Sequence, residues 1–214
     1  MEFLLSIDRT IFTLLNSILT NSLFDIVMPF LTDLNKIWFG RILAGILWIA
    51  LMWKGGARGR TAALLLFPLI LLSDQLSSSF IKPLAQRPRP CHLIGEIRVI
   101  QNVRLLVDCG SGYSFPSSHA VNNFAAAILF SFFFKKWFWM FISFAIIISY
   151  SRIYVGLHYP SDVMGGAMIG IACAFIILGL WKVLCQHVPA ISLDTEQHSL
   201  RESEVTKSQK KNAK

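Results

Sequence analysis

The chain has 214 residues, of which 54% are hydrophobic and only 15% are charged. A soluble domain carries about 25% charged residues, and a disordered chain is much less apolar. The composition therefore excludes a soluble globular protein as the default and indicates an integral membrane protein. The net charge of +8 is also typical of nucleic-acid-binding proteins. Here the basic residues lie between apolar runs, as the positive-inside rule predicts for membrane proteins, so we expect no nucleic-acid partner.

The first 35 residues are apolar but are interrupted by polar side chains such as Asp8 and Asn16. Ser22 followed by Asp25 resembles a capping box, which predicts that a second helix begins there. Two alternatives remain for the unit 1–35: one or two amphipathic helices at the membrane interface, or a first span. The segment lacks the basic start and small-residue cleavage site of a secretory signal peptide.

Five further apolar runs approach the length of roughly 20 residues that a bilayer core about 30 Å thick requires of a helix. They cover residues 38–53, 61–80, 119–134, 137–150 and 163–184. The last run is rich in Gly and Ala, which permit close helix packing. We predict an all-α fold, a polytopic membrane helix bundle of five to six transmembrane helices with its core over 36–188. The polar segment 189–214 predicts a disordered cytoplasmic tail.

The basic residues also predict the orientation of the bundle. They gather after the first long run, between the third and fourth runs, and in the tail. All three places fall on one side, which the positive-inside rule makes cytoplasmic. The loops 82–115 and 151–162 then face the periplasm or outside of a bacterial inner (plasma) membrane. Because loop 82–115 holds five basic residues against this rule, its charge requires a functional reason.

The outward loop contains two cysteines, Cys91 and Cys109. Residues 96–100 and 103–107 alternate in polarity between them, which favours a β-hairpin with its turn at 101–102. Such a hairpin brings the cysteines together, and a disulfide is compatible with an extracytoplasmic loop. The alternative is two free thiols.

Three polar clusters lie at helix ends on the outward side. Each has an ordinary explanation by itself: long cations snorkel to lipid headgroups, and Pro-Ser begins many helices. Together they place two histidines, an aspartate, two serines and at least three cations at one depth, which indicates a site. The clusters are Lys82 to Arg89-Pro90, Pro116-Ser117-Ser118-His119, and Ser151-Arg152 through His158 to Asp162.

The cations suit a phosphate group. Lys82, Arg89 and Arg152 can surround a tetrahedral dianion, and arginine offers forked donors to two of its oxygens. The helix beginning at Ser117 and Ser118 adds backbone N–H groups and the positive end of the helix dipole. The Ser117 hydroxyl can add one more hydrogen bond. This set predicts a phosphate pocket built without a metal or other cofactor.

The histidines suit the transfer of that phosphate. His158 and Asp162 are four residues apart around Pro160. Asp162 can therefore accept a proton from one imidazole nitrogen and orient the other for nucleophilic attack. His119 is a second imidazole, suited to protonating a leaving oxygen.

With these motifs the chain resembles the type 2 phosphatidic acid phosphatase family of lipid phosphate phosphatases. The family pattern is matched at its spacing in all three clusters, except that Ser118 stands where glycine is usual. The resemblance implies that His158 is the nucleophile and forms a phosphohistidine, that Asp162 orients it, and that His119 protonates the leaving group. It implies phosphate binding by Lys82, Arg89, Ser117, Arg152 and the backbone at Ser118, with no metal.

The resemblance implies an integral membrane phosphatase whose partners are the bilayer and a lipid phosphate or diphosphate. Phosphatidic acid, phosphatidylglycerol phosphate and undecaprenyl diphosphate are the expected substrates. One alternative is a lipid phosphotransferase that uses the same site. Another, of a different class, is a membrane transporter or scaffold, for which an acidic residue within an apolar run, Asp74, is the best support.

Four residues near the clusters have unsettled roles. Asp74 either pairs with a cation of the site or makes a structural polar contact between helices. Arg87 either touches the substrate phosphate or lies on the surface. Tyr154 and Tyr159 are expected at the membrane interface as anchors.

Overall fold

A computed structural model of the chain describes residues 2–34, 36–94 and 97–187. The predicted disordered tail at 189–214 lies outside these ranges. In chain order the elements are α1 (Glu2–Thr13), the π-helical segment η1 (Leu14–Ile18), α2 (Ser22–Thr32), α3 (Trp38–Lys54), α4 (Gly56–Asp74), the π-helical segment η2 (Gln75–Ile81), α5 (Lys82–Ala85), β1 (Leu93–Ile94), β2 (Ile97–Arg98), α6 (Ser118–Phe133), the 3₁₀ turn η3 (Lys135–Trp137), α7 (Phe138–Tyr154) and α8 (Pro160–His187).

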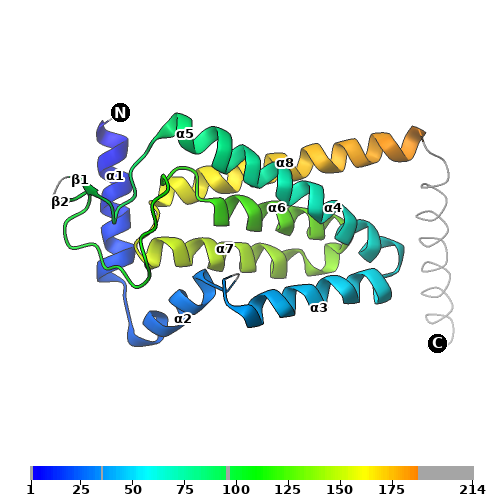
Figure 1. Cartoon of the computed structure of the whole chain (residues 1–214), viewed down its shortest axis with the longest axis horizontal. Helices are drawn as coiled ribbons and strands as arrows, with labels where there is room; N and C mark the ends of the chain where they lie inside the picture. Colours follow the sequence, from blue (N-terminus) through cyan, green and yellow to red (C-terminus); the bar gives the residue numbers. More distant parts are fainter. Residues whose placement is uncertain (1, 35, 95–96, 188–214) are drawn as a thin grey trace, which may run out of the picture.

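Five long helices, α3, α4, α6, α7 and α8, form the bundle (Figure 1). Helix α6 lies in its middle and contacts α4, α7 and α8. Large apolar side chains such as Phe67 and Trp139 remain exposed on the outer surface of the bundle, as expected where lipid surrounds a helix. The predicted all-α membrane bundle is confirmed, and each helix covers its apolar run to within a few residues.

Among the described residues, three helical stretches are long and apolar enough to cross a membrane: Gly56–Ala85, Lys135–Tyr154 and Pro160–His187. A bent pair near the N-terminus, Leu5–Ile18 with Ser22–Thr32, brings the number to four if it counts as one span. Helices α3 and α6 have 17 and 16 residues and lie in the same bundle. The number of five to six spans remains a prediction.

The two N-terminal helices are bent from one another by 115°. Helix α1 lies across one end of the bundle, while α2 lies beside the start of α3 (Figure 1). Both alternatives for residues 1–35 remain predictions, because the bent pair can also be one broken span. The expected cap at Ser22 is wrong by one residue: the side chain of Asn21 accepts a hydrogen bond from the Phe24 N–H at 2.8 Å. Asp25 instead accepts a hydrogen bond from the Tyr154 hydroxyl.

Close packing of α6 against α8 places the starts of these two helices side by side. A Cβ on Gly170 would lie 2.1 Å from the Val121 carbonyl oxygen, so only glycine permits this approach. At the helix starts the Ser117 N–H donates to the Asp162 carbonyl at 3.1 Å. The close approach of the two helices therefore holds the cluster at Ser117 beside the cluster at Asp162.

Four of the basic residues predicted on one side gather at one end of the bundle, while those of the tail lie outside the described residues. Arg58, Lys135, Lys136 and Lys182 line one shared hollow there, together with Trp137. Helix α1, α5 and the loop between α5 and α6 lie at the opposite end (Figure 1). The three polar clusters are therefore separated from the basic end by the length of the helices.

The loop between α5 and α6 contains a disulfide between Cys91 and Cys109, which excludes the alternative of free thiols. The predicted hairpin position is wrong. The two short antiparallel strands are β1 and β2, paired as Leu93 with Arg98 and Ile94 with Ile97. Part of the expected strand 96–100 lies outside the described residues. Residues 103–107 form no strand because Val103 and its neighbours pack against the turn after α7.

Candidate active site

The structure brings the three polar clusters together at one end of the bundle. Lys82 begins α5, Arg152 lies in the last turn of α7, and Asp162 lies in the first turn of α8. The charges of Arg89, Arg152 and Asp162 all act on the Lys82 ammonium group. Residues that are up to 80 positions apart in the chain therefore share one electrostatic environment.

Asp162 is fully buried and held on several sides. One of its carboxylate oxygens accepts hydrogen bonds from the Ser114 hydroxyl at 2.5 Å and the Tyr159 N–H at 2.8 Å. Its other oxygen accepts from the Arg87 guanidinium at 2.7 Å. His158 Nδ1 lies 3.7 Å from Oδ2, slightly beyond hydrogen-bond length. This geometry turns the His158 ring so that Nδ1 faces the carboxylate.

Arg87 does not lie on the surface, because its side chain is only 20% exposed, and its contact with a substrate phosphate stays a prediction. It bridges Asp162 to Asp8 of α1, whose carboxylate lies 2.5 Å from the guanidinium. Its guanidinium also stacks over the Tyr159 ring at 4.0 Å from the centroid. Asp8 accepts a further hydrogen bond from the Ser161 N–H at the start of α8. The sequence did not predict this role of Asp8, because α1 also carries Glu2, Arg9 and Thr10, so that an acidic residue in it is not distinctive.

His158 lies in the turn between α7 and α8 and is only 2% exposed. Burial lowers its pKa to about 4, and the nearby charges of Arg152 and Arg89 act in the same direction, while Asp162 opposes them. The imidazole is therefore neutral near neutral pH. A neutral ring with Nδ1 toward a carboxylate leaves Nε2 available as a nucleophile.

Five of the expected site residues carry a buried polar side-chain atom that has no hydrogen-bond partner in the described part of the chain. They are Arg89 Nε, Ser117 Oγ, His119 Nε2, Arg152 Nε and His158 Nδ1. A buried donor or acceptor without a partner costs about 1–3 kcal/mol. Such atoms are uncommon in native structures, and their concentration in one place indicates that a polar ligand completes the site.

The two site arginines are each held by one further contact. Arg152 is 4% exposed and donates from Nη1 to the Thr32 hydroxyl at the end of α2, at 2.7 Å. Arg89 donates from Nη1 to the carbonyl of Cys109 in the disulfide loop. Helix α2 and the disulfide loop therefore both orient a cation of the site.

The two tyrosines do not lie at the interface as expected, because both are buried. The Tyr154 hydroxyl donates to Asp25 at 2.6 Å, and the Tyr154 carbonyl accepts from Asn16 at 2.7 Å. Tyr159 packs against Phe12 of α1. These contacts attach the N-terminal helices to the segment that carries Arg152 and His158.

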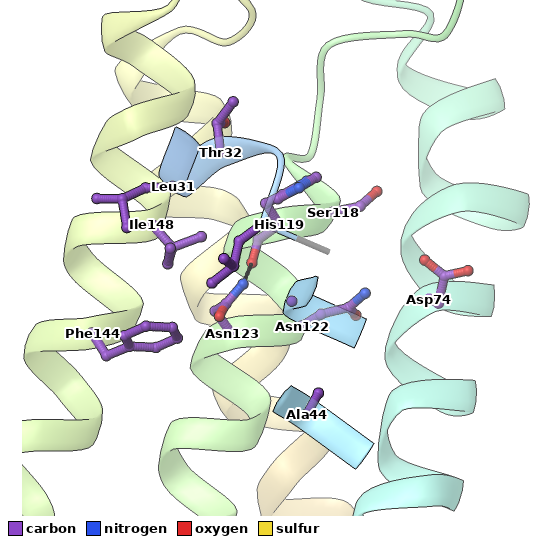
Figure 2. A pocket seen from close by; sticks show the side chains of 12 residues that line it. Leu31, Thr32, Ala44, Asp74, Ser118, His119, Asn122, Asn123, Phe144 and Ile148 are labelled. Carbon is purple, nitrogen blue, oxygen red and sulfur yellow. Dashed lines mark hydrogen bonds between the residues drawn. The ribbon is translucent and has the colours of Figure 1, made fainter. Parts of the chain in front are cut away.

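A cavity of about 440 Å³ opens beside His119 (Figure 2). Asp74 lies on its wall, where its carboxylate accepts a 3.4 Å hydrogen bond from Ser78, and Ser78 lies 3.3 Å from Ser118. Asp74 thus faces a cavity, has a polar contact, and interacts electrostatically with Lys82. The contact with Ser78 lies within one helical stretch, so it is not the expected contact between helices, and the pairing of Asp74 with a cation of the site stays a prediction. Within the described ranges, no three His, Cys, Asp or Glu residues lie grouped as metal ligands.

Comparison with known proteins agrees with this site. The sequence model of the PAP2 superfamily matches residues 63–184. The lipid A 4'-phosphatase of Bacteroides thetaiotaomicron is 37% identical over 177 residues, covering 79% of this chain and 74% of that protein. The undecaprenyl-diphosphatase BcrC of Bacillus subtilis is 28% identical, covering 73% and 74%. The crystal structure of Aquifex aeolicus LpxE superposes with a TM-score of 0.65 at 27% identity, covering 80% of this chain and 94% of that one. The chain therefore belongs to the PAP2 superfamily.

Proposed function

We propose that the protein is an integral membrane phosphatase that hydrolyses a lipid phosphate or diphosphate through a phosphohistidine intermediate. The observation that carries this proposal is that Ser117, Arg89 and Arg152 each have a buried donor atom without a hydrogen-bond partner in the described part of the chain. These donors share the site with a neutral His158. The names of the relatives support it, since they act on lipid A and on undecaprenyl diphosphate.

The substrate phosphoryl group binds between Lys82, Arg89 and Arg152. The Ser117 hydroxyl and the backbone N–H groups at the start of α6, including that of Ser118, complete the set of donors. Because charge spreads over the three equatorial oxygens of a phosphoryl group in the transition state, preorganised cations stabilise that state more than the free substrate.

His158 Nε2 then attacks phosphorus, and the bond from phosphorus to the leaving oxygen breaks. Asp162 stabilises the positive charge that develops on the imidazole. His119 donates a proton to the leaving oxygen, which departs as an alcohol from a monoester. From a diphosphate, the leaving oxygen belongs to the remaining lipid phosphate.

Water completes the reaction. His119, now neutral, takes a proton from water as the water oxygen attacks phosphorus. The phosphorus–nitrogen bond breaks, inorganic phosphate leaves, and His158 returns to its neutral form. No step in this sequence uses a metal ion, so chelators are expected to have no effect.

We place the site at the outer face of a bacterial membrane. The basic residues at the opposite end, including Arg58, Lys135 and Lys182, support this orientation. A disulfide within the loop of the site end, between Cys91 and Cys109, suits an oxidising compartment.

The test is phosphate release by detergent-purified protein, with EDTA present, across a panel of lipid phosphates and diphosphates. We expect release of inorganic phosphate and transient labelling of the protein by a ³²P-labelled substrate. Transfer of phosphate to a second lipid, with no free phosphate, would favour the phosphotransferase alternative. No turnover of any member of the panel would contradict the proposal.

A further inference from the structure

The cavity beside His119 is lined by residues of several helices of the bundle (Figure 2). Ser118 and His119 line it at the start of α6, and the next turn of the same helix adds Asn122 and Asn123. Residues four positions apart lie on one face of a helix, about 6 Å apart along its axis. Its deeper walls are mainly apolar and include Ala44, Phe144 and Ile148.

The polar atoms of this cavity are only partly satisfied by the protein. Asn122 Oδ1 accepts from the Ser73 hydroxyl at 2.7 Å, which leaves the Asn122 amide N–H groups for a ligand. Asn123 donates to the His119 carbonyl at 2.9 Å, which leaves the Asn123 amide oxygen as an acceptor. Asp74 accepts a long hydrogen bond of 3.4 Å from Ser78. The cavity thus offers one amide donor, one amide acceptor and one carboxylate.

The mechanism fixes which part of the substrate reaches this cavity. In an in-line displacement the leaving oxygen lies opposite His158, where His119 protonates it. The group bonded to that oxygen must therefore lie beyond His119. In a monoester this group is the carbon skeleton of an alcohol, whereas in a diphosphate it is a second, charged phosphate.

We propose that this cavity binds the leaving group and selects lipid monophosphates whose alcohol part carries hydroxyl or amide groups, in preference to lipid diphosphates. The inference rests on the proposed phosphatase function. Hydroxyl and amide groups can pair with Asn122, Asn123 and Asp74, and acyl chains can follow the apolar walls. A second phosphate would lie beside the Asp74 carboxylate in the cavity wall, and like charges repel.

Asp74→Asn tests the repulsion between the Asp74 carboxylate and the second phosphate of a diphosphate. Its readout is the ratio of kcat/KM for farnesyl diphosphate to kcat/KM for farnesyl monophosphate. These probes share a chain and a terminal phosphate and differ only in the leaving group, so a general loss of phosphate binding cancels. We expect the ratio to rise about tenfold, which is about 1.4 kcal/mol of transition-state energy.

Asn122→Leu tests hydrogen bonding between the cavity and a polar leaving group, with a second pair of substrates. The readout is kcat/KM for an N-acyl glucosamine 4-phosphate relative to farnesyl monophosphate. We expect this ratio to fall about tenfold, because a hydrogen-bonding site is replaced by an apolar one. Gln75→Leu is the matched control: Gln75 is an exposed polar residue next to Asp74 that does not line the cavity, and both ratios should stay within about twofold.

The possible results separate this inference from the proposed function. If the wild-type protein releases phosphate from none of the probes, the proposed function fails. If the wild type is active but Asp74→Asn and Asn122→Leu leave both ratios unchanged, the function stands and the leaving-group cavity is overturned. If Gln75→Leu changes the ratios as strongly as the two cavity variants do, the selectivity does not belong to this cavity, and the inference is overturned as well.

Discussion

The two sides of the site differ in how their polar groups are satisfied. On the Asp162 side, the carboxylate has three hydrogen bonds and is continued by Arg87 to Asp8. On the His119 side, the imidazole Nε2 and the Ser117 hydroxyl are buried and have no hydrogen-bond partner in the part of the chain described. The Asp162 carboxylate is satisfied by the protein itself, whereas the His119 Nε2 and the Ser117 hydroxyl are left for substrate to pair with.

This difference follows the chemistry that each side is proposed to perform. A nucleophile needs fixed orientation, and rigid neighbours remove the cost of arranging it during the reaction. A leaving group changes from substrate to substrate, so its surroundings must accept groups of different shape. The protein's own hydrogen bonds therefore fix the groups around Asp162, whereas the groups around His119 can still form hydrogen bonds with a substrate.

The largest expected effect is at the nucleophile. His158→Ala should lower the rate of phosphate release by at least about a thousandfold, since it removes the proposed nucleophile. The assay is phosphate release from a lipid monophosphate, with size-exclusion chromatography in detergent to check folding. Activity near that of the wild type in a folded variant would rule out the covalent mechanism.

His119→Ala should have the next largest effect, about a hundredfold with an alkyl phosphate, because general acid catalysis typically contributes that much or more. Its loss should be much smaller with p-nitrophenyl phosphate, whose leaving group needs no proton. The measurement is kcat/KM for both substrates in both proteins. Equal losses for the two leaving groups would assign His119 to phosphate binding instead of proton donation.

Asp8→Asn should lower kcat about tenfold with little change in KM, because Asp8 positions Arg87, and through it Asp162, without touching substrate. Asp8→Glu should restore part of the loss. Asp25→Asn is the matched control: it also removes an ion pair of an N-terminal helix, with Arg104, but makes no contact with Asp162.

Equal losses in Asp8→Asn and Asp25→Asn would mean that Asp8 only attaches α1 to the bundle. A rise in KM alone would likewise contradict a positioning role, because it would place the effect on substrate binding.

The smallest effect concerns pH. Because burial disfavours the charged imidazole, its pKa of about 4 means that His158 stays neutral as pH falls from 7 to 5 and becomes protonated only near pH 4. An NMR titration of ring-labelled histidines in detergent, with His158→Gln to assign the signal, measures this directly. A midpoint near the ordinary value of about 6.5 would show that this side of the site is more hydrated than its burial indicates.

Much of the site was accessible from residue type and spacing. Arg152, His158 and Asp162 could be predicted to lie together because only a short turn and the first turn of a helix separate them in the chain. The connections that support these residues were not accessible. Asp8 meets Arg87 across 79 positions, and Thr32 meets Arg152 across 120, and no local pattern encodes such partners.

The outward loop shows how a local pattern can mislead. Alternating polarity favoured a strand over 103–107, but Val103 is 6% exposed and packs in the cluster with Tyr154 and Val155. Leu106 donates its N–H to the carbonyl of Val155 after α7 instead of to a hairpin partner. Burial against the bundle outweighs the pairing that the alternation suggests.

The sequence by itself determined the membrane bundle, the position of its helices and the residue types of the phosphate site, because apolar run length and motif spacing are local properties. The tertiary structure alone decided that α1 supplies Asp8 to the Asp162 side and that a cavity opens beside His119. Both depend on which helices pack together, and that is settled by the fit of side chains across the whole bundle.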